Sequence, residues 1–230
     1  MKLLHVRLEG WTATFRLPLI FSGTSLTAPV PPYSTLLGLM GNLAAREIKP
    51  HETRIGYKFQ SVGTSYDLET TRRLELDKNT GRLKAQRVPG IATRQFHVRP
   101  ELDLYLDNLD LRKVFEQPAN APCLGRSQDL AWIREVEEIE AEPFDEGVVR
   151  GTLIPFPQPG ASGQILNLPD YFHNDQRGYT RSVGRMAKFL AVRYETPARI
   201  KREDLFRVTS AKEEEVIYLH SCSVGAHQGV

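Results

Sequence analysis

Alternating hydrophobic and polar residues at the start of the chain predict a β-strand with one buried face. Leu4, Val6 and Leu8 alternate with polar residues, and a period of two places them on one side of a half-buried strand. Beyond Gly10 the alternation changes parity, because the hydrophobic residues among positions 11–15 are odd-numbered. A bulge or bend at Gly10 produces such a change. We therefore predict a first strand that bends at Gly10.

The next segment, residues 17–45, has no charged side chain and yet does not read as a membrane span. Four prolines within it force extended or turn backbone over its first half. After Pro32, hydrophobic residues recur at helical spacing and predict a helix with Ser34 as a candidate N-cap. The opposite helix face carries small residues, at Ser34, Gly38, Gly41 and Ala45. This stripe predicts close approach by another strand or helix, or by a phosphate at the helix N-terminus.

Further hydrophobic patterns predict strands, a hairpin turn and one more short helix. The strand patterns lie at residues 55–59, 102–106, 188–194 and 216–220, with another strand starting near Leu130. Residues 77–81 read as a hairpin turn, and residues 109–117 as a short helix. This order suits an α+β fold in which helices cover one face of an antiparallel sheet, as in the ferredoxin-like (RRM-like) domains that bind RNA.

Charge is unevenly distributed, although the formal net charge of the 230-residue chain is only +2. Residues 82–99 contain five Arg or Lys and no acid, and residues 177–202 contain eight Arg or Lys and one acid. Residues 135–146, in contrast, contain seven acids and no base. The two basic segments favour a surface that faces a polyanion, with an acidic face elsewhere. Each segment alone is also compatible with an ordinary solvated surface.

The basic segment 82–99 predicts a projecting hairpin with Pro89 and Gly90 at its tip. In its second arm, Gln95, His97 and Arg99 share one face, so one side can be buried while the other meets solvent or RNA. Arginine and lysine side chains hold phosphates, and an apolar tip residue can wedge against an unstacked base. An ordinary basic hairpin at the surface is the alternative.

Residue usage argues against several other classes of protein. The two cysteines, Cys123 and Cys222, lack the spacing of a zinc site or a disulfide framework, so we expect no metal. No Walker loop, dinucleotide fingerprint or hydrolase elbow occurs, so we expect no cofactor. The first residues lack the apolar core of a signal peptide, and we expect a cytoplasmic protein without membrane contact.

An ordered set of motifs resembles the CRISPR-associated Cas-five family, most closely its type I-B members. The set comprises residues 31–39 (PPYSTLLGL), 55–59 (IGYKF), 67–69 (DLE), 94–96 (RQF) and 124–127 (LGRS). The resemblance runs from residue 1 to about 133, and the Pro-Pro-x-Ser-Thr block is its strongest part.

The resemblance implies a ferredoxin-like RNA-binding domain over residues 1–140, with a thumb hairpin at about 77–99, and a strand-rich C-terminal extension over residues 141–230. It also implies a non-catalytic subunit of a type I Cascade complex. Such a subunit binds and caps the 5′ handle of the CRISPR RNA, beside a backbone (Cas-seven) subunit and a large (Cas-eight type) subunit. It meets target DNA only indirectly, through the complex.

By position, the residues expected to contact RNA belong to the helix start, the basic hairpin and the segment around residue 126. They are Tyr33, Ser34, Thr35, Arg82, Lys84, Arg87, Arg94, Gln95, His97, Arg126 and Ser127.

Two other functions remain open at this stage. Some relatives, those of type I-C, cut repeat RNA without metal by general acid and base catalysis, and Tyr33, His97 and Lys84 are chemically suitable for this. The chain lacks the adjacent Lys-His pair that cutting relatives use, and we expect no catalytic residue. The other possibility is a protein-interaction scaffold whose acidic segment 135–146 meets a basic partner.

Overall fold

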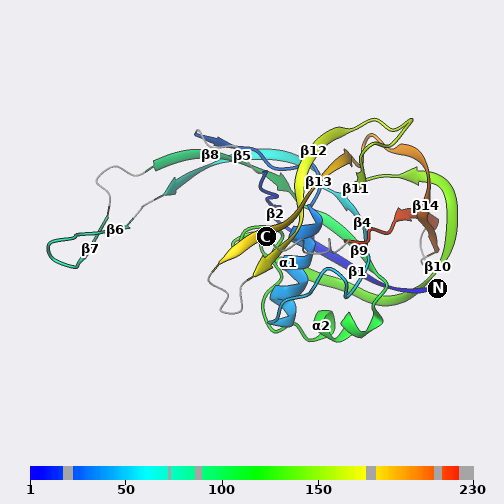
Figure 1. Cartoon of the computed structure of the whole chain (residues 1–230), viewed down its shortest axis with the longest axis horizontal. Helices are drawn as coiled ribbons and strands as arrows, with labels where there is room; N and C mark the ends of the chain where they lie inside the picture. Colours follow the sequence, from blue (N-terminus) through cyan, green and yellow to red (C-terminus); the bar gives the residue numbers. More distant parts are fainter. Residues whose placement is uncertain (18–22, 72–73, 86–89, 175–179, 210–213, 223–230) are drawn as a thin grey trace, which may run out of the picture.

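The hydrophobic alternation of the chain produces a fold made mainly of antiparallel strands, with few helices. The structure is a computed structural model that describes residues 1–17, 23–71, 74–85, 90–174, 180–209 and 214–222. A long, narrow ribbon of strands projects from a rounded body (Figure 1). Within the described part of the chain, no helix has the length and apolar character needed to span a bilayer. With its many antiparallel strands and few helices, the architecture is α+β and rich in strands.

The N-terminal strand lies inside a six-stranded sheet whose neighbouring strands are all antiparallel. The strand order is β15-β14-β10-β1-β9-β4. The bounds are Lys2–Gly10 (β1), Ile55–Gln60 (β4), Glu101–Leu106 (β9), Ala131–Val149 (β10), Ala198–Thr209 (β14) and Glu214–Tyr218 (β15). The strands predicted at 55–59 and 102–106 are confirmed. The predicted bend is confirmed too, because the chain leaves this sheet after Gly10 and its next strand joins another one.

Helices connect the strands on one side of this sheet. Helix α1 (Tyr33–Ala44) lies between β1 and β4 in the chain, and η1 (Leu109–Leu111) and α2 (Arg112–Glu116) lie between β9 and β10. Leu4, Val6 and Leu8 share one hydrophobic core with the buried side chains of α1. The apolar face predicted for the helix is therefore the face that packs on the sheet.

The start of α1 differs from the sequence-based prediction of Ser34 as N-cap. The N-cap is Pro32, which has extended backbone (φ −61°, ψ 147°), and no side chain caps the helix. The carbonyl of Pro32 accepts hydrogen bonds from the backbone N–H groups of Thr35 and Leu36, 2.9 and 3.2 Å away. The prediction is wrong because a fixed proline φ leads the chain directly into the first turn.

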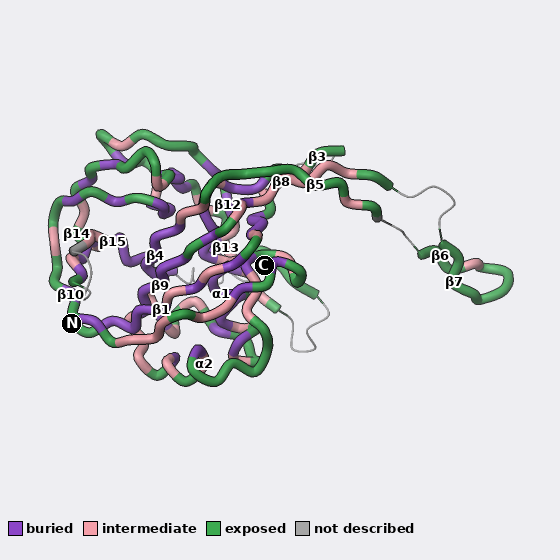
Figure 2. The backbone as a smooth tube through the Cα atoms, turned by 180° about the vertical axis from the view of Figure 1, so that it is seen from behind, coloured by how far each residue is buried: buried purple, intermediate pink, exposed green. Residues whose placement is uncertain are grey.

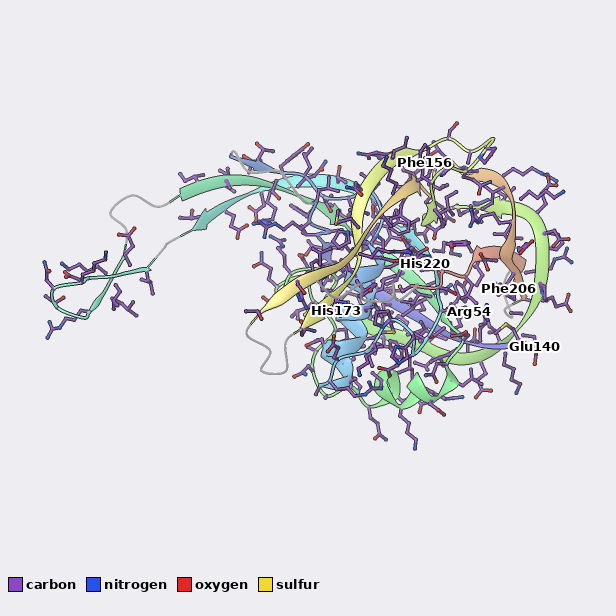
Figure 3. All side chains as sticks on the ribbon, viewed as in Figure 1. Arg54, Glu140, Phe156, His173, Phe206 and His220 are labelled. Atoms are coloured by element: carbon purple, nitrogen blue, oxygen red, sulfur yellow. The ribbon has the colours of Figure 1, made fainter. Side chains whose placement is uncertain are left out.

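The six-stranded sheet closes on itself at its two ends. The backbones of Ile55 in β4 and His220 after β15 exchange two hydrogen bonds of 2.9 Å. The face enclosed by this closure carries a second hydrophobic cluster that includes Leu3 and Phe206. Figure 3 labels both Phe206 and Arg54, whose guanidinium carbon lies 5.6 Å from the centre of the Phe206 ring.

A largely buried set of charged residues occupies the same enclosed face. We call His5, Arg7, Lys58 and Asp103 the Asp103 cluster. His5 Nε2 and Arg7 Nε lie 3.0 and 2.9 Å from Asp103 Oδ1, and Lys58 Nζ lies 3.4 Å from Asp103 Oδ2. Burial acts to raise the pKa of Asp103, but the hydrogen bond to His5 and the charges of Lys58 and Arg7 outweigh it and lower the pKa to about 2. The prediction of a half-buried first strand is therefore corrected, since His5 is only 3% exposed.

The projecting ribbon lies between residues 63 and 98, and each of its strands pairs with a strand from the other half of this segment. Strands β5 (Gly63–Thr71) and β8 (Gly90–Val98) form its shaft, and β6 (Leu74–Leu76) and β7 (Leu83–Ala85) form its distal end. The short strands β2 (Thr12–Ala13) and β3 (Thr24–Ser25) pair with β8. Figure 2 shows that the ribbon is mostly exposed, in contrast to the buried interior of the body.

The ribbon differs from the hairpin predicted at residues 82–99. Gly90 starts a shaft strand, and Pro89 lies outside the described residues, so Gly90 is not at the tip. The distal turn is instead the predicted turn at residues 77–81, where the Gly81 N–H donates to the Asp77 carbonyl over 2.8 Å. The first arm was missed because β5 is polar along most of its length and lacks a hydrophobic alternation.

A smaller sheet from the second half of the chain lies over α1. Its order is β11-β13-β12, with bounds Thr152–Pro155 (β11), Gln164–Asn174 (β12) and Arg181–Val192 (β13). Figure 1 shows the β12–β13 hairpin crossing α1. The domain boundary expected between residues 140 and 141 lies inside β10, and one hydrophobic core includes residues from both sides of it. The acidic segment 135–146 is likewise part of β10, where Glu137 contacts His5 over 3.0 Å.

Candidate nucleic-acid interface

An open cleft of about 1080 Å³ lies where five parts of the chain meet. Helix α1 contributes Ser34, Thr35 and Gly38, and the ribbon contributes Glu69 and Arg94. The loop before β10 contributes Arg126 and Ser127, and the end of the β12–β13 hairpin contributes Phe172 and Arg181. The segment after β2 adds Thr14 and Arg16. We call this feature the cleft.

The small face of α1 forms part of the cleft floor. A Cβ added at Gly38 would meet no atom within 4 Å, so the helix surface there is open. The same test at Gly41 meets the Arg46 carbonyl oxygen at 3.1 Å, where the chain turns after the helix. The structure therefore leaves the middle of the predicted stripe uncovered beside the cleft.

The charge of the cleft is positive. Among the described residues that line it, four are arginines (Arg16, Arg94, Arg126 and Arg181) and one, Glu69, is acidic. Arg94 forms an ion pair with Glu69, so this acid orients Arg94 and does not neutralise the other three arginines. Four guanidinium groups around one open cleft can bind several phosphates of a polyanion.

Arg126 is held in place by a buried carboxylate. Its Nε and Nη2 each lie 2.9 Å from an oxygen of Asp129, whose side chain is fully buried. Burial acts to raise the pKa of Asp129, but the hydrogen bonds from Arg126 and Thr12 outweigh it, so this pKa is lowered. The pairing uses only part of the guanidinium, which has five N–H donors. Arg126 therefore has donors left for a ligand in the cleft.

A glycine sets the course of the same loop. Gly125 has a φ of +109°, and a Cβ there would lie 1.9 Å from the Thr14 carbonyl oxygen. The loop backbone is thus pressed against the start of the chain, where the Thr14 N–H donates to the Leu124 carbonyl over 3.0 Å. A side chain at position 125 would push Arg126 and Ser127 away from the cleft.

Comparison with known protein families identifies the chain. Residues 3–179 match the family described as CRISPR-associated protein (Cas_Cas5). The chain belongs to this Cas-five family. The match extends well beyond residue 133, where the resemblance in the sequence ended, and includes β12 with the cleft residue Phe172. A search of curated proteins found no match.

Solved structures share the fold of this Cas-five chain. A chain described as "CRISPR RNA-guided surveillance complex" superimposes with a TM-score of 0.56 at 16% identity, covering 86% of this chain and 91% of the other. A CRISPR protein from Archaeoglobus fulgidus superimposes with a TM-score of 0.50 at 12% identity, covering 96% and 100%. At these identities the likeness concerns the fold alone.

Five of the residues predicted to contact RNA in the Cas-five chain line the cleft together. They are Ser34, Thr35, Arg94, Arg126 and Ser127. They come from α1, the ribbon and the loop before β10, so the fold brings together three of the motifs on which the family resemblance rested.

Four other predicted residues lie along the ribbon or outside the described chain. Gln95 lies beside Arg94, and its amide nitrogen is 3.3 Å from both Thr64 Oγ1 and Tyr66 Oη. Arg82 and Lys84 belong to the distal end, where Lys84 pairs with Asp77, and Figure 1 shows this end far from the body. Arg87 lies outside the described residues.

Tyr33 and His97 are buried, which corrects their assignment as RNA contacts. Tyr33 is 1% exposed and donates a 2.6 Å hydrogen bond to the Leu153 carbonyl. His97 is 4% exposed, and its Nε2 lies 2.8 Å from the Ala28 carbonyl. Both rings pack against core aromatics, Tyr33 against Tyr57 and His97 against Phe59. Sequence alone missed this because a helix-start tyrosine and a strand histidine look the same whether they face the core or solvent.

The candidate catalytic groups are also poorly placed for joint chemistry. Burial raises the pKa of Tyr33 well above its usual value, and burial lowers the pKa of His97 despite the Ala28 hydrogen bond. Lys84 lies on the distal end of the ribbon, away from both. The structure thus buries two of the three residues that an acid and base mechanism would combine and places the third on the ribbon.

One cluster of potential metal ligands occurs among the described residues, at Asp170, His220 and Cys222, all buried. Its atoms already satisfy one another, because His220 Nε2 and Arg185 Nη2 lie 2.8 and 2.6 Å from the two oxygens of Asp170. Burial raises the pKa of the Cys222 thiol, which disfavours the thiolate that a metal requires. The cluster therefore ties β12 and β13 to the segment after β15, and Figure 3 shows His220 inside the body.

Sequence reasoning missed several cleft residues of the Cas-five chain, among them Arg16, Phe172 and Arg181. Arg181 lies in the basic segment 177–202, which predicts a positive surface but not where in the fold this residue lies. The residues next to Arg16 and Phe172 in the sequence form no pattern that predicts a binding site. Only the tertiary fold brings these two distant positions together around α1.

Proposed function

We propose that this protein is a non-catalytic subunit of a type I Cascade complex, of the type I-B kind, and that it binds and caps the 5′ handle of the CRISPR RNA. The cleft carries the proposal, because it brings four arginines and the polar start of α1 to one open surface. Membership of the Cas-five family supports the same role. Arginines spaced around an open cleft suit a single strand with flexible phosphates.

The topology supports the proposed RNA-binding class. We assign a ferredoxin-like domain on the order β10-β1-β9-β4, with helices after the first and third of these strands in the chain. We assign the ribbon the role of the thumb, which would reach an adjacent backbone (Cas-seven) subunit along the RNA. A large (Cas-eight type) subunit and, through the complex, target DNA complete the proposed partners.

Replacing Arg16 and Arg94 with alanine is expected to weaken handle binding and to flatten its salt dependence. Each lost phosphate contact should lower the slope of log K against log salt by about 0.7. Fluorescence anisotropy with a labelled 5′ repeat RNA, titrated from low to physiological salt, measures both quantities.

The matched control for this experiment is Arg199→Ala. Arg199 lies on β14 and pairs with Glu146 at an exposed position, and it does not line the cleft. The control should bind RNA as the unaltered protein does. An unchanged salt slope in the double variant would contradict the proposal, as would protein that purifies with its partner subunits but binds no RNA.

The proposed absence of catalysis has its own test. Because Tyr33 and His97 are buried and Lys84 lies on the distal end of the ribbon, incubation of the pure protein with repeat RNA in EDTA is expected to leave the RNA intact, as seen on a denaturing gel. Specific cleavage that disappears in His97→Ala would instead support the endoribonuclease alternative.

A further inference from the structure

We propose that Phe172 of β12, backed by Arg181 of β13, stacks against one unstacked base of the bound RNA at the rim of the cleft, and we call this contact the clamp. This inference rests on the proposed function, which places RNA in the cleft, and it adds the element that recognises a base rather than a phosphate. It also gives a role to the second half of the chain, which the sequence motifs left without one.

Phe172 and Arg181 form a preassembled pair at the rim of the cleft. The guanidinium carbon of Arg181 lies 5.1 Å from the centre of the Phe172 ring. Asn174 is the cross-strand partner of Arg181, and its Oδ1 accepts a 3.2 Å hydrogen bond from Arg181 Nε. A planar cation and an aromatic ring are therefore held together by the hairpin ladder before any ligand binds.

The pair of Phe172 and Arg181 lines two neighbouring cavities beside α1. Phe172 and Arg181 line the cleft and also a smaller cavity of about 350 Å³, and Ser34 and Gly38 line both. Phe172 is only partly buried, so part of the ring remains accessible from the cleft. A base entering from the cleft can thus lie against the ring while its phosphates stay near the arginines.

Strand β12 is fixed to the body immediately before Phe172. Tyr171 is 2% exposed, and a Cβ at Gly184 would lie 2.1 Å from its ring, so the glycine on the opposite strand makes room for the tyrosine. Asp170, the preceding residue, is anchored by Arg185 and His220. In Figure 3, His173 marks the end of β12 and His220 the body to which the hairpin is tied. A rigid support of this kind limits the entropy cost of stacking.

The chemistry favours a nucleobase over other occupants. A half-buried aromatic ring backed by a guanidinium, at the rim of an arginine-lined cleft, combines the stacking surface and the phosphate-binding groups of single-strand RNA sites. Stacking accepts any base, so the clamp would add affinity without demanding one sequence.

The test uses the full chain, the 5′ repeat-derived segment of CRISPR RNA, and the variants Phe172→Leu and Phe172→Tyr. Leucine keeps an apolar side chain at position 172 but removes the aromatic face, and tyrosine keeps both. We expect Phe172→Leu to weaken binding roughly tenfold to one-hundredfold, as loss of one stacked base does, and Phe172→Tyr to bind nearly as the unaltered protein. The salt slope of both variants should stay unchanged, because no phosphate contact is lost.

An abasic scan of the RNA then locates the base. In the unaltered protein, one abasic position should weaken binding by a similar factor, and in Phe172→Leu that position should have no further effect. Equal binding by Phe172→Leu and the unaltered protein, or fully additive effects of the abasic site and the substitution, would overturn the clamp. These results are distinct from failure of the proposed function, in which the unaltered protein itself would not bind RNA.

Discussion

Replacing Asp103 with asparagine is expected to lower the free energy of unfolding by about 3–5 kcal/mol. The carboxylate lies in the enclosed face of the six-stranded sheet, where Asp103 is 4% exposed. Its loss removes the anion that His5, Arg7 and Lys58 share and leaves their three positive groups with only Glu137 and Glu215. Removing one partner of a buried ion pair costs this much because the remaining charge stays desolvated. Urea unfolding followed by circular dichroism measures the change.

The same variant should lose part of the sensitivity of the fold to acid. The folded pKa of Asp103, about 2, lies below its usual 3.8. A lowered folded pKa means that the ionised form stabilises the fold above about pH 4, by on the order of 2 kcal/mol, and that this stabilisation disappears as the pH falls towards 2. Glu146→Gln is the control, because its pair with Arg199 is exposed and should matter little. Equal stability of Asp103→Asn and the unaltered protein at pH 7 would show that the cluster does not depend on this charge.

Substituting alanine for Gly125 is expected to destabilise the fold by about 3 kcal/mol and to reduce RNA binding at the cleft. The new Cβ would lie 1.9 Å from the Thr14 carbonyl oxygen at a φ of +109°, so the loop must move. Movement of the loop carries Arg126 and Ser127 with it, and both line the cleft. Thermal unfolding and RNA anisotropy together measure the two effects.

Gly81→Ala separates backbone strain from close packing in this experiment. Gly81 also has a positive φ of +64°, but a Cβ there would meet no atom within 4 Å. Only the conformational cost of about 1–2 kcal/mol applies, and the cleft should bind RNA normally. If Gly125→Ala were as mild as Gly81→Ala in both measurements, the packing of the loop against Thr14 would not control the cleft.

Local patterns were sufficient to predict the main elements of the fold. The strand at residues 4–8, the leucine strand at 102–106 and the apolar face of α1 all appear in the structure, because each is set by neighbours within one element. The polar strand β5 and the closure of the sheet were not predictable in this way. Both depend on residues far apart in the sequence, such as the pairing of Ile55 with His220.

In the candidate interface, too, the sequence predicted some features and only the fold shows the others. Ser34, Thr35, Arg94, Arg126 and Ser127 were predicted from motifs and do meet at the cleft. The motifs gave the residue types, whereas only the fold shows which of them face solvent. Whether the cleft residues contact RNA stays a prediction, which the salt and abasic experiments address.

The pairing of Ile55 with His220 also has a consequence for biosynthesis. Strand β4 is made early, but the backbone groups of Ile55 find their partners only at His220. During translation, a nascent chain must therefore keep the Ile55 end of the β4 edge unpaired until residues near 220 have left the ribosome. Unpaired strand edges invite association between chains, so this interval is the period of greatest aggregation risk for the polypeptide.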